Sequence, residues 1–346
     1  MKRNLGIFTT VLLGGALVAH AQDGVSVGGY VDAQYNWNNT KDTGGVSNAD
    51  SSVNTFRFNE GAVYLSKKVG GAEVFVDLDF AGPAKSATSG FTGTPVAEDW
   101  TVGESKSQAY VSMSYDNGFA WRLGQFDSLF GFEGNDTHTI KYAAHGVMWD
   151  QMPVTHVGWH GSYEFSDMFT VHGLVANPYN QGHMNNGNLD FGLKANTKFD
   201  SFNFNLGVLV NTGDHEATGN DKQSGYIVDM DIGSNWGMWD AALYGYASKG
   251  DTKGTKTDFG VGVDLGMKWS DTVHGGLRFE WLKDGTESAA APKDATIEVT
   301  VGPQFHLAEG FVAKLDYTWE SISYDSSISS ESQVAHSINL AGVFKF

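Results

Sequence analysis

The chain has 346 residues and no cysteine, and 40 acidic against 22 basic residues give it a formal charge of −18. A chain without cysteine cannot be held together by disulfides, and the acidic balance argues against nucleic acid as a partner. Because 44 glycines, 22 phenylalanines, 13 tyrosines and 10 tryptophans accompany only 6 prolines, the composition favours curved β-sheet.

The first 21 residues have the layout of a signal peptide. Lys2 and Arg3 precede an apolar stretch over residues 5–18, and small side chains follow at Ala19 and Ala21. We expect cleavage between Ala21 and Gln22, so that residues 1–21 form the signal peptide and residues 22–346 form one barrel domain. A short membrane anchor is the alternative. No later window of roughly eighteen apolar residues exists, which excludes helical membrane spans.

Residues that alternate between apolar and polar recur along the rest of the chain. In residues 311–320 the side chains of Phe311, Leu315 and Trp319 share one face, and Lys314 lies on the other. A β-strand with one apolar and one polar face produces this period of two. The same pattern occurs over residues 73–80, 202–211, 258–269 and 273–281.

The connections between these segments alternate in length, as in bacterial outer-membrane barrels. Seven short turns and eight longer loops predict about sixteen strands, within a range of roughly 12 to 18. The alternation is poor over residues 54–65 and 226–233, which makes the strand count less firm. The turns fall at residues 69–71, 116–118, 166–167, 200–201, 233–237, 270–272 and 308–310. The loops fall at residues 38–52, 81–105, 128–152, 177–187, 212–222, 249–256, 284–294 and 323–332.

The last ten residues form an amphipathic segment that ends in an aromatic side chain. Ile338, Leu340, Phe344 and Phe346 share one face, and a terminal aromatic resembles the signal that the barrel assembly machinery reads. A soluble β-sandwich or lectin is the alternative, but it predicts neither this ending nor the alternating loop lengths. We therefore expect an all-β protein with a single closed antiparallel transmembrane β-barrel, short periplasmic turns and long extracellular loops. It would cross the outer membrane of a Gram-negative bacterium many times, in contact with its lipid and lipopolysaccharide.

No set of residues with the spacing of a catalytic or metal site is apparent. His156 and His160 are four residues apart, which on a strand separates them by roughly 13 Å, too far to share one metal. The Gly-x-Ser-x-Gly and Walker patterns are absent. We expect no catalytic, cofactor-binding or metal-binding residues, no cofactor and no enzyme activity. An outer-membrane lipase or protease would need a reactive Ser/His pair or paired acids near the membrane rim.

The polar strand faces carry scattered charges that we assign to the lumen. Asp77 and Asp79 resemble an acid/base pair, but a general acidic lining explains them more simply. In porins of about sixteen strands a long loop folds inward and narrows the channel, and residues 128–152 are the candidate here. An outward-pointing surface loop is the alternative. The candidate lumen acids are Asp77, Asp79, Asp264, Asp316 and Glu320. The candidate constriction residues are Glu133, Asp136, Arg122, Arg278 and Lys314, with Arg57 in an ambiguous strand.

Three segments resemble the OmpL-like β-barrel porin family. They are FRFNEGAVYL at residues 56–65 followed by an acidic strand at 74–80, LGQFDSLFGFE at 123–133, and PVTHVG at 153–158. The resemblance covers most of the mature chain and implies an outer-membrane porin-like barrel of undefined substrate, with no catalytic residues to carry over.

These observations predict a porin whose water-filled channel passes small hydrophilic solutes and ions by passive diffusion. The acidic lining favours cations. Porins commonly form homotrimers, and the sequence leaves the oligomeric state open. The alternative function is a non-conducting outer-membrane barrel with an adhesion or envelope-structural role, for which a filled lumen would be the distinguishing feature.

Overall fold

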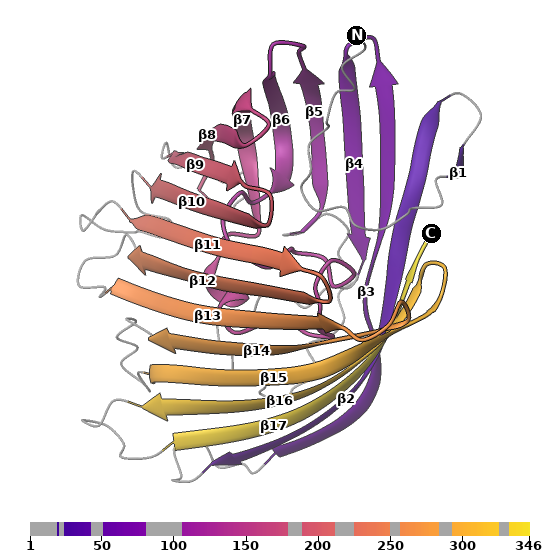
Figure 1. Ribbon diagram of the computed structural model, residues 1–346, viewed down its shortest axis with the longest axis vertical. Coiled ribbons are helices and arrows are strands. Elements are labelled where there is room, and N and C mark those ends of the chain that lie inside the picture. The colour runs from indigo at the N-terminus through magenta and orange to yellow at the C-terminus, as the bar shows by residue number, and fades with distance from the viewer. Residues whose placement is uncertain are drawn as a thin grey trace, which may run out of the picture.

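The computed structural model describes residues 19–20, 24–42, 51–80, 106–178, 189–211, 225–249, 257–283, 293–324 and 332–346. In this part of the chain, β2 to β17 form a closed antiparallel barrel of sixteen strands, in which each strand pairs with its neighbours in the sequence (Figure 1). The last strand returns to the first strand of the barrel, with Ala341 opposite Gln34. Closure leaves no free sheet edge, which is the condition for strands to cross a bilayer.

The short strand β1 (Ala19–His20) pairs with β2, with Ala19 opposite Val27. Residues 1–18 and 21–23, including the predicted cleavage point at Ala21 and Gln22, lie outside the described residues. The strands of the barrel are β2 (Val25–Asp42), β3 (Ser51–Val69), β4 (Ala72–Phe80), β5 (Gln108–Ser114), β6 (Phe119–Asp127), β7 (Thr155–Ser166), β8 (Phe169–Ala176), β9 (Asp190–Lys198), β10 (Phe202–Asn211), β11 (Tyr226–Trp236), β12 (Trp239–Lys249), β13 (Thr257–Lys268), β14 (Val273–Lys283), β15 (Lys293–Ala308), β16 (Phe311–Tyr324) and β17 (Ser332–Lys345).

Side chains alternate between the outside and the inside of the barrel, as the period of two predicts. On β13, Val261 and Leu265 are exposed on the outside whereas Asp264 is buried inside. Large aromatic residues such as Trp236 and Trp239 flank the short turns. An apolar outer belt with aromatics near its rim is the surface that a lipid bilayer requires. None of the described helices is long and apolar enough for a membrane span.

The two segments with poor alternation have physical explanations. In β3 the pairing with β2 shifts between Asp32 and Ala33, so that Asn59 is an extra residue and both it and Glu60 are buried. A β-bulge of this kind reverses the alternation at one point of the strand. In β11 an apolar residue, Ile227, faces inward and is buried, which hides the period.

The predicted turns agree with the structure, with one difference. The turn that was expected over residues 233–237 is shorter, because β11 continues to Trp236 and only Gly237 and Met238 separate it from β12. Gly237 has φ of +67°, a left-handed conformation that glycine adopts without steric cost.

Candidate functional site

The connection between β6 and β7 enters the barrel, as the magenta segment in Figure 1 shows. We call residues 128–152 the inward loop. Its side chains Phe130, Met148 and Met152 are buried in one apolar cluster with wall residues such as Leu209. The alternative of an outward-pointing surface loop therefore does not hold. A single helical turn, η1 (Trp149–Gln151), lies near the end of the loop.

Glycines on the inner face of the wall make room for the inward loop. A Cβ atom added at Gly207 would lie 2.9 Å from the ring of Phe130, and one at Gly276 would lie 2.6 Å from the hydroxyl of Tyr142. Since packed interiors do not tolerate such short contacts, the loop fits this wall because these positions lack a side chain. Part of the space left by small inward-facing residues is therefore occupied by the loop.

The predicted constriction residues Glu133 and Arg278 form an ion pair between the loop and β14. The Oε1 atom of Glu133 accepts a hydrogen bond from Nη1 of Arg278 at 2.5 Å, and its Oε2 accepts the N–H of Gly146 at 2.8 Å. Nη2 of Arg278 donates to Glu298 at 2.9 Å. Burial raises the pKa of Glu133 even though Arg278 opposes that change. The guanidinium group of Arg278 thus joins the loop to two neighbouring strands.

Lys314 binds the backbone of the loop and not its acidic side chains. Its Nζ atom donates to three carbonyl oxygens, those of Thr137 at 2.6 Å, Ile140 at 2.7 Å and Tyr142 at 3.1 Å. Since one ammonium group has three donors, these contacts use all of them. Lys314 therefore fixes the path of the loop on the β16 side of the barrel.

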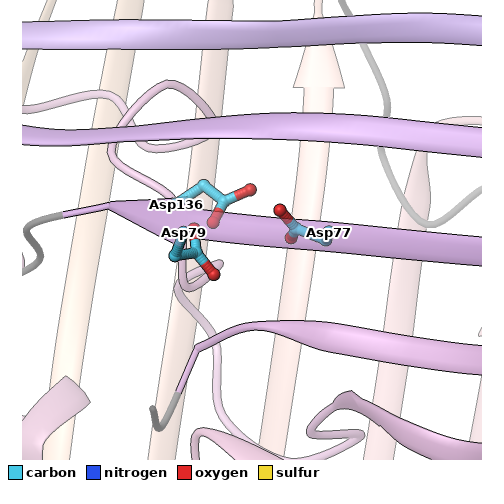
Figure 2. A group of neighbouring side chains, drawn as sticks. All are labelled: Asp77, Asp79 and Asp136. Atoms are coloured by element: carbon cyan, nitrogen blue, oxygen red, sulfur yellow. The ribbon is translucent and has the colours of Figure 1, made fainter. Parts of the chain in front are cut away.

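Asp136 contacts the wall at β3 and β4, a few strands away from β16. Its Oδ2 atom accepts a hydrogen bond from the hydroxyl of Tyr64 at 2.8 Å. It also lies beside the predicted lumen acids Asp77 and Asp79, and one carboxylate oxygen from each of the three residues lies within 4.8 Å of the others (Figure 2). The structure thus gathers acids that are widely separated in the sequence.

Arg122, the fifth residue of the predicted constriction, is not brought to the loop acids. Its Nε atom donates to Nδ1 of His160 at 3.1 Å, and its guanidinium carbon lies 4.2 Å from the ring centre of Phe126. Arg122 therefore belongs to a separate cluster on the wall at β6 and β7.

The remaining predicted lumen acids lie on the inner face. Asp264 pairs with Lys141 of the inward loop, and Asp316 accepts the backbone N–H of Ala143. Glu320 is half-buried on β16, at a position directly opposite the inward-facing Glu298. Asp264 and Asp316 therefore hold the loop.

Several wall charges that hold the loop were not predicted from the sequence. Glu280 lies in a segment of clear alternation, which places it in the lumen, whereas Glu60 and Asp229 lie in the two segments whose alternation is poor. For none of the three does the sequence show what the side chain binds. Each accepts a backbone N–H of the loop: Glu60 that of Thr137 at 2.7 Å, Glu280 that of Met148 at 3.0 Å, and Asp229 that of Gly131 at 3.2 Å.

A serine and a histidine meet where the inward loop begins. Ser128 Oγ lies 3.2 Å from Nε2 of His156, and the same oxygen accepts the N–H of Phe130. Nδ1 of His156 is buried and has no hydrogen-bond partner in the described part of the chain. A catalytic triad needs a third group at that nitrogen to orient the imidazole, so this contact is better explained as a support for the start of the loop.

Solved structures share this fold at low sequence identity. The outer membrane channel DcaP of Acinetobacter baumannii matches with a TM-score of 0.65 and 12% identity, covering 94% of this chain and 99% of that one. Outer-membrane expressed OmpT of Vibrio cholerae matches with a TM-score of 0.61 and 11% identity, covering 95% of this chain and 100% of that one. In-vitro folded OmpT of the same species, described as a trimer form, matches with a TM-score of 0.57 and 12% identity, covering 94% of this chain and 100% of that one. An anion-selective porin from Comamonas acidovorans matches with a TM-score of 0.60 and 11% identity, covering 93% of this chain and 99% of that one.

These likenesses establish the barrel fold and do not transfer a substrate. A search among curated proteins finds no match. The porin-like barrel and a match to one protein family together place the protein in the outer membrane. That match extends over residues 24–346, and the chain accordingly belongs to the family described as "Putative beta-barrel porin-2, OmpL-like".

Proposed function

We propose that this protein is a porin whose water-filled channel passes small hydrophilic solutes and ions by passive diffusion. The observation that carries this proposal is the ion pair of Glu133 with Arg278, which holds a loop inside a closed barrel. A loop fixed inside a lumen narrows the passage and sets the size of the solutes that cross it. Glu133, Asp136, Arg278 and Lys314 would then form the constriction.

We further propose that the channel prefers cations. The support comes from this chain alone, since one structural neighbour is described as anion-selective. Buried acids outnumber buried bases on the described inner face, and such an excess produces a field that attracts cations. The buried acids are Asp32, Glu60, Asp77, Asp79, Asp190, Asp229, Asp231, Asp264, Glu280, Glu298 and Asp316, and the buried bases are Lys106, Lys194, Arg278 and Lys314.

The mature protein would begin at Gln22 after removal of residues 1–21, a proposal that rests on the sequence pattern alone. We also propose a homotrimer, because OmpT is described in a trimer form. The mass of the purified protein in detergent, measured by light scattering, tests the second proposal, and the N-terminal residue of protein isolated from membranes tests the first.

The decisive experiment measures the current across a planar bilayer that contains the refolded protein, with a salt gradient across the bilayer. Discrete steps with a reversal potential biased towards cations are expected. Asp264→Asn should reduce that bias because it leaves Lys141 without one of its acids. Asp271→Asn is the matched control, because the Asp271 side chain is 95% exposed at a short turn.

A folded barrel that carries no current would contradict the proposed channel function and favour the non-conducting alternative. The apolar cluster that the inward loop forms with the wall is the observation on the side of that alternative, since it fills part of the lumen. A conducting barrel with an anion-biased reversal potential would overturn the cation preference only.

A further inference from the structure

Three carboxylates from two distant segments meet inside the barrel. Asp77 and Asp79 are two residues apart on β4 and therefore point to the same face of the strand. Asp136 reaches them from the inward loop. One oxygen from each side chain lies within 4.8 Å of the others, and Figure 2 shows the three side chains gathered at one place.

The cluster contains carboxylate oxygens that nothing in the protein binds. The side chains of Asp77 and Asp79 are only 1% and 9% exposed. Both oxygens of Asp79 and Oδ1 of Asp77 are buried without a hydrogen-bond partner in the described part of the chain. Because buried polar atoms are nearly always paired, orphaned oxygens of this kind indicate a missing ligand.

The neighbouring groups satisfy only part of the cluster. Gln108 donates to Oδ2 of Asp77 at 3.3 Å, and Tyr64 donates to Asp136. Lys106 is the nearby ammonium group, but it is committed to Glu60 at 2.6 Å and to the carbonyl oxygen of Asn135 at 2.8 Å. Three close carboxylates repel one another strongly in a buried setting, and one ammonium group shared with Glu60 does not balance them. The nearby His138, whose Nδ1 atom lies 3.7 Å from Asp136, adds positive charge only when it is protonated.

A divalent cation would supply that charge. Ca²⁺ binds carboxylate oxygens at about 2.3–2.6 Å, so two oxygens on opposite sides of one ion lie about 4.8 Å apart. Carboxylates without histidine or cysteine suit Ca²⁺ better than a transition metal. We propose that Asp77, Asp79 and Asp136 form a binding site for a divalent cation of the Ca²⁺ class, which joins the inward loop to β4.

This site gives the loop an attachment that depends on the ion. The Glu133–Arg278 ion pair fixes the loop to β14 without any ligand, whereas the attachment to β4 needs the cation. Binding is independent of whether the barrel conducts. The effect of the ion on current rests on the proposed channel function.

The test uses the refolded full-length barrel in detergent, stripped with a chelator and then titrated with CaCl₂ by calorimetry. Saturable binding of one ion per chain is expected. Asp79→Asn and Asp136→Asn should each weaken it by roughly tenfold or more. Asp231→Asn is the matched control, because Asp231 is also a buried wall acid but is paired with Asn205 at 2.7 Å, and its affinity for Ca²⁺ should equal that of the unmodified protein.

Luminescence of Tb³⁺ as a Ca²⁺ substitute gives a second readout, because Tyr64 donates to Asp136 and can transfer excitation to a bound lanthanide ion. Tyr64→Phe should keep the affinity for Ca²⁺ within a few-fold. No saturable Ca²⁺ binding by a heat-modifiable, folded barrel would overturn the proposal. Equal binding by the unmodified protein and both aspartate variants would overturn it as well. Absence of current with intact binding would affect only the channel proposal.

Discussion

Arg278 of β14 and Glu133 of the inward loop are 145 residues apart in the sequence and are joined at 2.5 Å inside the barrel. Arg278 is almost completely buried, and its Nη2 atom donates to Glu298 on β15. A buried ion pair contributes little net stability compared with apolar packing, but the loss of one partner leaves the other charge unpaired. The guanidinium group is therefore a fixed connection between wall and loop.

Replacing Arg278 should release this connection. Arg278→Met leaves Glu133 and Glu298 buried without their cation, which should cost about 3–5 kcal/mol. We expect a lower temperature for the heat-induced mobility shift and a noisier current through the channel. The control is Lys283→Met, because the pair of Lys283 with Asp294 at 3.1 Å is about half exposed and should matter by less than about 1 kcal/mol. Equal stability of both variants would contradict the role of Arg278.

The inner wall should be intolerant of side chains where the loop packs. A Cβ atom at Gly207 would lie 2.2 Å from Oδ1 of Asp229 and 2.9 Å from the ring of Phe130. Gly207→Ala should therefore destabilise the protein by about 1–3 kcal/mol. At Gly173, also within a strand, an added Cβ meets nothing within 4 Å, so Gly173→Ala should be close to neutral. Thermal unfolding followed by circular dichroism compares the two, and similar losses in both would argue against loop packing as the cause.

Acid should strengthen the docking of the loop through Glu133. Burial raises the pKa of Glu133 in the docked loop. The positive charge of Arg278 lowers this pKa, and the negative charge of Glu298 raises it. The docked state therefore binds more protons than a released loop at pH values between the ordinary and the raised pKa. Lowering the pH through that window favours docking, because protonation removes a buried charge while a neutral carboxyl oxygen can still accept the hydrogen bond from Arg278.

This pH dependence can be read from the current noise of single channels as the pH is lowered from neutral towards the ordinary pKa of a glutamate carboxyl, about 4.3. The unmodified channel should become quieter in acid. Glu133→Gln is neutral throughout, so its noise should change less with pH. A noisier unmodified channel in acid would show that the charged form of Glu133 holds the loop.

The barrel was predictable because its information is local. The period of two in residues 258–269 predicted β13 (Thr257–Lys268) within a residue or two, since the lipid outside and the polar interior impose opposite requirements on alternate side chains. The bulge at Asn59 was not predictable in the same way. An extra residue depends on the pairing with Asp32 in another strand, and its only signal in the sequence was the loss of a clear period.

The candidate site depends on contacts that no local pattern encodes. Arg278 and Lys314 were selected by residue type and strand face, and the structure brings both to the loop that carries Glu133. The same reasoning placed Arg122 with them, although it lies beside His160 instead. The neighbourhood of Asp136 and Asp79 was not foreseen, because a loop without periodicity gives no indication of which wall it faces.

Phe346 provides a test of the assembly signal that is separate from stability. Its backbone N–H and carbonyl oxygen both pair with Gly29 at 3.0 Å, and these bonds do not need its ring. Phe346→Ala should therefore lower the amount of folded barrel in the outer membrane several-fold while refolding of the purified protein in detergent stays nearly unchanged. Phe344→Ala is the matched control, because Phe344 lies two residues earlier and is 46% exposed. One contrary outcome is an equal fall in the amount of folded barrel in the outer membrane for both variants, and another is a failure of Phe346→Ala to refold in detergent. Either result would show that the terminal ring contributes to the stability of the barrel and not to its recognition by the assembly machinery.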